Sequence, residues 1–397
     1  MLSVLKNVDF RKVFFAQLIS LIGTGFTTIA LGLLAYNLDA NSGPLILGTI
    51  FSIKMISYVV VAPVSAGLFY KFPRKKFLIL VNIFRIFPVF FIPFINDVWQ
   101  VYVLVFLFQA ATAAYTPTIQ ALIPEILTDE KNYTDGLSVM RITSDLENIA
   151  SPIFAGLLLI LFDIELLFYL TCGSFFISSL LISIAIFPEM DQGKARDFFK
   201  NVGSGIKIYR TTPRLKGLFS LSIVTSSVGA MVLVNTVFIV RSDLEMSESF
   251  VGVALAAFGT GSIVTASMMS KLLLRYTDRY IMLLGGLISI SSLFVFGIIS
   301  INIEISFITL LCFWFCVGIG YSAILTPSGR ILTRSAATKD RTGLFATQFA
   351  LSHLCWLITY PLAGALTSYW SSSVAMLVMP MVAVFGFLSA IRLWKVL

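Results

Sequence analysis

The chain carries a series of long apolar runs, each of a length that crosses a lipid bilayer as a helix. The apolar core of a bilayer takes about 20 residues in helical form. Backbone groups in lipid have no water to bond, so open strands are excluded and these runs are expected to be helical. Twelve runs can be placed, at residues 13–36, 45–69, 77–95, 98–122, 136–161, 166–187, 217–240, 250–274, 280–303, 305–329, 342–369 and 373–393. The sequence therefore predicts an all-α membrane protein with twelve transmembrane helices in two six-helix repeats.

The composition agrees with a chain that is surrounded by lipid. Hydrophobic residues make up 58% and charged residues 12% of the 397 positions, and the mean hydropathy is +0.94. A water-soluble domain has roughly a quarter charged residues. Cys312 and Cys316 are one helical turn apart and could pair on a metal, but no second ligand pair lies nearby. We therefore expect ordinary buried cysteines, no metal and no cofactor.

The positions of Lys and Arg predict the orientation. Of the 28 basic residues, 24 lie at the termini or in alternate loops that share one side, and only Arg241 lies in the opposite loops. Basic loops stay in the cytoplasm. We expect a multi-pass protein of the bacterial inner (cytoplasmic) membrane, a monomer with both termini cytoplasmic. The net charge of +8 then follows from topology and does not indicate a nucleic-acid partner.

The longest polar stretch, residues 188–216, divides the chain into two halves, 1–187 and 217–397. In this stretch five residues share one face of a helix whose opposite face is rich in Lys and Arg: Phe198, Phe199, Val202, Ile206 and Tyr209. The pattern is typical of an amphipathic helix that lies on the inner leaflet. A flexible linker with chance apolar spacing is the alternative.

Short segments recur in the two halves at nearly constant separation. Thr116-Pro117-Thr118 is followed 210 residues later by Thr326-Pro327-Ser328, and Gly136-Leu137 is followed 207 residues later by Gly343-Leu344. Repeated halves are typical of carriers that bind their substrate where the halves meet.

The segment Gly67-Leu68-Phe69-Tyr70-Lys71-Phe72-Pro73-Arg74-Lys75-Lys76 resembles the cytoplasmic loop signature of the major facilitator superfamily. It keeps the leading Gly67 and the closing basic pair. Lys71 stands where the family has an acid, and Arg74 where it has a second glycine. The resemblance implies a gating role for this loop. In the fifth run, Pro152 and Gly156 resemble a degraded form of the family's exporter motif.

A narrower resemblance is to the branch that holds enterobactin exporters and macrolide-efflux proteins. It rests on Tyr115-Thr116-Pro117-Thr118-Ile119-Gln120-Ala121-Leu122-Ile123-Pro124-Glu125 in the fourth run and on Asn82-Ile83-Phe84-Arg85 in the third. This resemblance implies outward transport of a sizeable secreted or toxic metabolite by proton antiport, and a siderophore or metallophore fits it.

Five ionisable residues lie at bilayer depth in the first half, where each costs on the order of 3 kcal/mol: Lys54, Arg85, Arg141, Asp145 and Glu147. Arg141 and Asp145 are four residues apart and can neutralise each other on one helix face. Glu147 points roughly opposite and is the better candidate for a proton carrier, because a carboxylate without a fixed cation has a raised pKa. Asp145 is the other candidate.

Lys54, Arg85 and Arg141 are interpreted as cations that face an anionic substrate; the alternative for Lys54 and Arg85 is that they pair with these acids. His353, in the second half, either titrates or only hydrogen-bonds a neighbouring helix. Polar and aromatic residues that could line the site, or merely pack, are Tyr36, Gln109, Tyr115, Asn235, Tyr321 and Trp356.

The sequence has no match to the phosphate-binding pattern G-x-x-x-x-G-K-[ST], so ATP is not expected to drive the protein. We predict a secondary active exporter, coupled to protons, of an anionic or zwitterionic metabolite such as a siderophore. A multidrug or macrolide efflux pump and a nutrient importer are the alternatives within transport. A receptor or scaffold remains open as another class, whereas a membrane-embedded enzyme would need clustered catalytic groups that the chain lacks.

Overall fold

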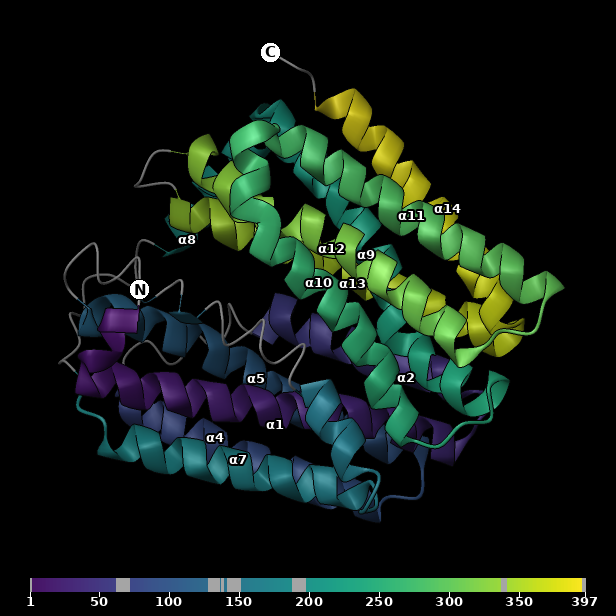
Figure 1. Ribbon diagram of the computed structural model, residues 1–397. Coiled ribbons are helices and arrows are strands. Elements are labelled where there is room, and N and C mark those ends of the chain that lie inside the picture. Colours follow the sequence, from purple (N-terminus) through teal and green to yellow (C-terminus); the bar gives the residue numbers. More distant parts are fainter. Residues whose placement is uncertain are drawn as a thin grey trace. The chain divides into compact units, whose positions relative to one another are not determined.

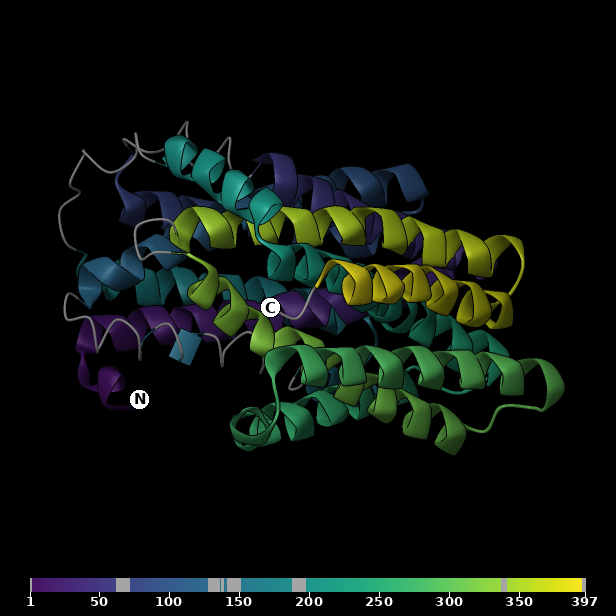
Figure 2. The ribbon, with the colours of Figure 1, turned by 90° about the horizontal axis from the view of Figure 1, so that it is seen from above.

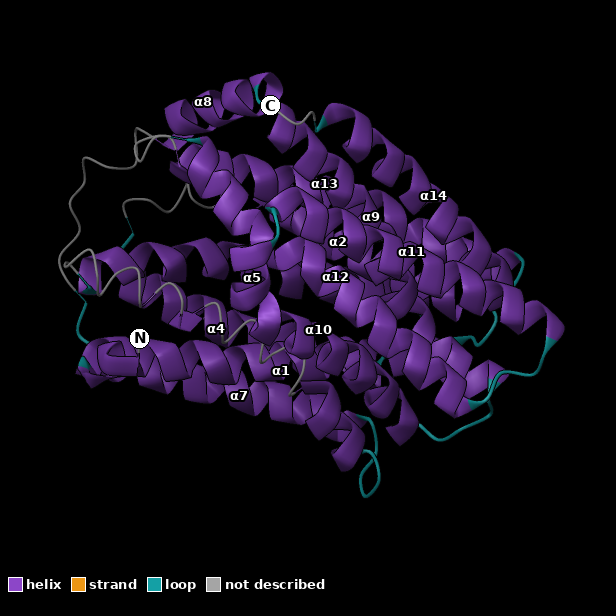
Figure 3. Cartoon of the chain, turned by 45° about the horizontal axis from the view of Figure 1, so that its top comes forward, coloured by secondary structure: helices purple, strands orange, loops and turns teal. Residues whose placement is uncertain are grey.

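The computed structural model describes residues 2–61, 72–127, 136, 139–140, 151–187, 198–336 and 341–394. Within these ranges all regular secondary structure is helical (Figures 1 and 3). The long helices are α1 (Val8–Leu38), α2 (Gly43–Ile56), α4 (Arg74–Phe91), α5 (Val98–Ile126), α7 (Glu165–Ile184), α8 (Phe198–Thr211), α9 (Pro213–Phe238), α10 (Ser249–Arg275), α11 (Asp278–Asn302), α12 (Phe307–Ser335), α13 (Arg341–Tyr369) and α14 (Ser372–Leu393).

Eleven helices in the described ranges are long and apolar enough to cross a membrane. They match eleven of the twelve predicted runs, and the all-α membrane fold is confirmed. The remaining run, 136–161, lies mostly outside the described residues and is helical at 151–158. Some helices extend beyond the apolar runs, at ends where a polar side chain forms a hydrogen bond with an otherwise unpaired backbone group. Asn7 Oδ1, for example, accepts the Phe10 N–H at 3.0 Å, so α1 begins at Val8, before the apolar run.

The helices pack into two compact units. The first unit comprises Met1–Leu34 and Ile56–Ala195, and the second comprises Ala35–Met55 and Arg196–Leu397. The end of α1 and nearly all of α2 therefore belong with the later helices. The division expected from the repeats, 1–187, 188–216 and 217–397, stays a prediction.

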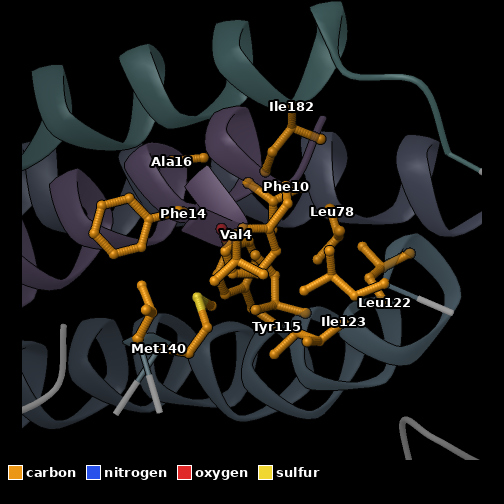
Figure 4. Close-up of a cluster of buried hydrophobic side chains, with 14 residues drawn as sticks. Val4, Phe10, Phe14, Ala16, Leu78, Tyr115, Leu122, Ile123, Met140 and Ile182 are labelled. Atoms are coloured by element: carbon orange, nitrogen blue, oxygen red, sulfur yellow. The ribbon is translucent and has the colours of Figure 1, made fainter. Parts of the chain in front are cut away.

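A buried apolar cluster holds the first unit together near the start of α1 (Figure 4). Phe10, Phe14 and their neighbours on α1 pack with Leu78 of α4, Ile123 of α5 and Ile182 of α7. The side chains stack at helical spacing on the inward faces of four helices. Removing such side chains from water stabilises the packed state by about 25 cal/mol per Å² of buried apolar surface.

In the second unit, α9 is the most deeply buried helix, and α12, α13 and α14 pack against it. The helices α13 and α14, yellow-green and yellow in Figure 2, run side by side. The buried face of α9 carries several Ser, Thr and Gly residues, which allow the close approach typical of helices in membranes. Trp314 of α12 is fully buried beside it, and its indole N–H donates to Thr236 Oγ1 at 2.7 Å.

Backbone atoms come into contact where α2 packs on α13. A Cβ on Gly48 would lie 2.5 Å from Tyr360 O, and a Cβ on Gly364 would lie 2.2 Å from Pro44 O. Both distances are too short for any side chain. The backbone N–H of Leu45 also donates to Ser368 Oγ at 3.0 Å. Glycine is therefore required at these two positions for α2 to lie this close to α13.

Gly364→Ala should destabilise the protein by about 1–3 kcal/mol, because the new methyl group forces α2 away from α13. The measurement is the thermal unfolding midpoint in detergent. Gly329→Ala on α12 is the matched control, since nothing lies within 4 Å of its added Cβ. Alanine there should stabilise the helix by roughly 0.5–1 kcal/mol. Equal midpoints for the two variants would contradict the contact.

The outward faces of both units carry large apolar side chains. Phe94 and Leu161 are 60% and 77% exposed in the first unit, and Phe385 is 67% exposed in the second. Aromatic residues also lie exposed at helix ends, including Trp99, Tyr369 and Trp370. Exposed apolar belts with aromatic residues at their ends are what a bilayer requires of a protein surface.

Candidate functional site

Arg85 is the charged centre of the first unit. Its side chain, on α4, is 1% exposed. The guanidinium carbon lies 4.1 Å from the ring centre of Tyr115 on α5 and 4.3 Å from that of Phe175 on α7. A guanidinium between two aromatic faces gains cation–π attraction, which is strongest when water is excluded. The three helices thus hold the cation in one place.

Polar groups from α4, α5 and α7 also line this site. A terminal N–H of Arg85 donates to Asn82 Oδ1, and Asn82 Nδ2 donates to Ser178 Oγ at 3.0 Å. The Tyr115 and Ser178 hydroxyl oxygens lie 3.4 Å apart. The Arg85 Nε has no hydrogen-bond partner. In the part of the chain that the structure describes, no carboxylate pairs with Arg85. Among the described residues, the Arg85 cation is therefore not stabilised by an acidic partner.

Gln109 lies on α5 with Tyr115, six residues earlier. Its side chain is 4% exposed, and its Oε1 has no hydrogen-bond partner. A buried acceptor without a donor costs about 1–3 kcal/mol. Such a group is retained when it has a use other than packing, so Gln109 remains a candidate for substrate contact.

A second group of predicted site residues comes together in the second unit. Lys54 of α2 and His353 of α13 are half-buried and lie close enough to interact electrostatically. Next to them, the rings of Trp356 and Tyr360 on α13 are 4.8 Å apart, and Phe51 of α2 lies 4.9 Å from Tyr360. A cation and a histidine thus lie beside a run of aromatic rings, a combination that suits a substrate with both charged and planar parts.

His353 is not an isolated histidine. Its Nδ1 lies 2.7 Å from Phe349 O in the preceding turn, and its ring is 3.8 Å from the Phe349 ring. This contact lies within α13, and the two expectations for His353, titration or a hydrogen bond to a neighbouring helix, stay predictions.

The other predicted lining residues lie elsewhere in the second unit. The Tyr36 hydroxyl donates to Arg241 O at 3.3 Å, and the Arg241 guanidinium carbon lies 5.2 Å from the Tyr36 ring centre. Tyr321 of α12 packs against Phe258 of α10, with ring centres 5.2 Å apart. Asn235 is fully buried on α9 and donates to Met231 Sδ. The Tyr36 and Tyr321 contacts join neighbouring helices, whereas the Asn235 contact lies within α9 and leaves Asn235 Oδ1 without a hydrogen-bond partner.

Among the residues of the predicted gating loop, Gly67 and Lys71 lie outside the described residues. Arg74 and Lys76 lie in the first turn of α4, and Lys75 Nζ donates to Ala185 O at 2.9 Å. Lys12 Nζ donates to the adjacent Ile184 O at 2.8 Å. Two cations therefore stabilise the carbonyl end of α7, as its dipole favours.

An ionic cluster that the sequence interpretation missed lies in the second unit. Asp278, at the start of α11, is 3.5 Å from Arg330 Nε and 3.2 Å from Arg334 Nη1 on α12. Arg214 Nη2 donates to Arg334 O at 2.6 Å and ties α9 to the same cluster. Asp278 follows Lys71 by 207 residues, the separation found between Gly136 and Gly343. The repeat spacing was the signal that could have located this acid.

The exporter-motif residues Pro152 and Gly156 are buried one turn apart on the helical segment 151–158. The adjacent Ser151 Oγ donates to Ile22 O of α1 at 3.3 Å, so this face packs on α1. Arg141, Asp145 and Glu147 lie outside the described residues, and their roles stay predictions.

Four residues that complete the two sites were not predicted from the sequence: Phe175, Ser178, Phe51 and Tyr360. Each is one apolar or small residue among many, so no sequence pattern distinguishes it.

This fold defines a polytopic membrane protein with buried charge in its helices. The model of the Major Facilitator Superfamily matches residues 13–239 and 218–397. The chain therefore belongs to the Major Facilitator Superfamily, and it is a membrane transport protein, not an enzyme.

Relatives and solved structures agree with this assignment. The chain is 24% identical over 381 residues to the uncharacterized MFS-type transporter YfiS of Bacillus subtilis (strain 168), covering 91% of this chain and 88% of YfiS. It is 22% identical to macrolide efflux protein A of Streptococcus pyogenes, covering 55% of this chain and 54% of that protein. The nucleoside transporter NupG (D323A mutant) shares the fold with a TM-score of 0.79, at 10% identity and with 97% of this chain and 100% of NupG covered. A D-xylose-proton symporter does so with a TM-score of 0.75, at 14% identity and with 96% of each chain covered.

Proposed function

We propose that the protein is a secondary active exporter that exchanges protons for an anionic or zwitterionic metabolite, such as a siderophore or another metallophore. One observation carries the proposal. At bilayer depth, the ionisable side chains that the structure describes are Lys54, Arg85 and His353, whereas the described acids lie at helix ends or in loops. An excess of buried positive charge favours an anion over a cation, because charge interactions are strong at low dielectric.

Proton coupling is assigned to Glu147, with Asp145 as the second candidate. The sequence supports this role, since both acids fall at bilayer depth in the predicted fifth helix. A carboxylate that binds a proton on one side of the membrane and releases it on the other can couple export to the proton gradient. Outward direction is supported by the half-length similarity to a macrolide efflux protein.

The test of the substrate class is secretion by a deletion strain under iron or zinc limitation. Loss of the protein should lower the metal-chelating activity of the medium, with the missing compound identified by mass spectrometry. Lys54→Ala should reproduce most of this loss. A charge-assisted contact to a substrate is worth about 1.5–3 kcal/mol, so its removal should weaken substrate affinity by about tenfold or more. Lys271→Ala, which removes an exposed lysine at the end of α10, is the matched control and should secrete normally.

The second candidate function is efflux of macrolides or other drugs, which the similarity to macrolide efflux protein A favours. Unchanged chelator secretion together with hypersensitivity to macrolides or ethidium would establish it in place of metallophore export. Both functions use the same fold and the same direction of transport.

We further propose an inner-membrane monomer with both termini and the segment 188–216 in the cytoplasm. In that orientation a cysteine at position 203 (Gly203→Cys, in a background without the four native cysteines) should not react with a membrane-impermeant maleimide in intact cells. It should react after the cells are broken open. A cysteine at Glu304 (Glu304→Cys), exposed in the predicted outer loop between the runs 280–303 and 305–329, is the matched control and should react in intact cells. The reverse labelling pattern would show that the protein has the opposite orientation in the membrane.

A further inference from the structure

The linker helix α8 is fixed to the second unit along one face. Gly205 packs against the backbone of α13, where an added Cβ would lie 2.3 Å from Gly343 O. One turn later Tyr209 is 5% exposed, and its hydroxyl donates to Gln348 Oε1. Gln348 Nε2 in turn donates to Ser222 Oγ of α9 at 3.2 Å. Burial raises the pKa of the Tyr209 phenol, so the phenol stays protonated and keeps this hydrogen bond. Two helices of the bundle therefore hold α8 in one orientation.

This attachment leaves the opposite face of α8 exposed. Ile206 is 47% exposed, and Lys207 and Arg210 are exposed beside it. Lys216 is exposed one turn into α9. No acidic residue occurs between positions 198 and 216. We call Ile206, Lys207 and Arg210 the α8 basic face. Helix α8 itself, beside α13, can be followed in Figure 3.

The α8 basic face lies within a few residues of a candidate membrane span. Helix α8 ends at Thr211, and α9, which starts at Pro213, is a candidate span. A half-exposed isoleucine beside two cations is unfavourable in water. The arrangement is favourable at a bilayer surface, where the apolar side chain enters the acyl region and the cations meet phosphate groups.

We propose that the α8 basic face is a docking surface for the headgroups of anionic phospholipids. Charge complementarity selects the occupant: two cations and no acid on a fixed face attract a leaflet of anionic lipid more strongly than a zwitterionic one. Lys207 and Arg210 are three residues apart on a helix, so their side chains can contact a single phosphate or two neighbouring ones. The site does not depend on which substrate the protein carries.

The experiment is native mass spectrometry of the full-length protein after exchange into mixed micelles with phosphatidylglycerol or phosphatidylcholine. The wild-type protein should retain phosphatidylglycerol in preference to phosphatidylcholine. The double variant Lys207→Ser/Arg210→Ser should lower the retained phosphatidylglycerol by about threefold or more. Ile206→Ser should lower retention of both lipids, since its contact is with acyl chains.

Lys271→Ser/Arg275→Ser is the matched control, because it removes the same charge from exposed positions at the end of α10. It should retain phosphatidylglycerol like the wild type. Equal losses in the two double variants would overturn the proposal in favour of a diffuse effect of net charge. Wild-type retention in Lys207→Ser/Arg210→Ser would overturn it outright. Thermal unfolding of each variant in detergent confirms that the fold is kept.

Discussion

Arg85→Met should lower transport by about tenfold or more and change folded stability by less than about 2 kcal/mol. The guanidinium is fully buried between Tyr115 and Phe175, so methionine fills much of the same volume. Replacing a buried charge by an apolar group of similar shape is often neutral for folding. What the substitution removes is the positive charge of Arg85, which acts on an anion at low dielectric without direct contact.

Transport into proteoliposomes and thermal unfolding in detergent, measured on the same preparation, separate the two effects. Arg85→Lys keeps the charge but loses the planar stack on two rings, and it should retain more transport than Arg85→Met. Tyr115→Phe is the matched control: it keeps the ring and removes only a hydroxyl that lies 3.4 Å from Ser178 Oγ. Wild-type transport by Arg85→Met would show that this cation serves packing alone.

Glu147→Gln should abolish substrate accumulation driven by a proton gradient while substrate exchange across the membrane continues. Glutamine has the shape of a protonated glutamate but cannot release a proton, so the carrier can still change state with substrate bound. The measurement compares gradient-driven uptake with counterflow in proteoliposomes between about pH 6 and 8. Exchange should keep most of its rate, and gradient-driven uptake should fall to background.

Asp145→Asn gives the contrasting outcome. Asp145 is four residues from Arg141, and its loss should leave that arginine without a partner in lipid and lower the folded yield. If Glu147→Gln transports normally over the whole pH range, the proton role passes to Asp145 or to His353.

Hydropathy alone predicted most of the fold. Runs of about 20 apolar residues can cross a bilayer only as helices, and the gaps between the predicted runs include Asn96-Asp97 and Ser371. In the structure Asp97 and Gln100 form a capping box at the start of α5, and Ser371 Oγ accepts the Val374 N–H at 3.2 Å. These are local interactions, which is why the sequence indicated them.

The candidate site was less predictable, because its contacts join residues far apart in the chain. The position of Arg85 at bilayer depth was evident from the sequence, but its enclosure by Tyr115 and Phe175 depends on how three helices pack. Lys54 and His353 come close only because two glycines bring α2 against α13. The charge cluster around Asp278 was not predicted, because its partners Arg330 and Arg334 lie on another helix far along the chain.

The glycine contact between α2 and α13 has an evolutionary consequence. Backbone atoms at Gly48 and Gly364 hold these helices together, so the neighbouring side chains at Phe51, Lys54 and His353 are not needed for adhesion. Substitutions at those three positions can alter what the carrier accepts without separating the helices. Single substitutions can therefore change the substrate specificity as long as the two glycines are kept. Relatives with the same helix contact can transport very different substrates.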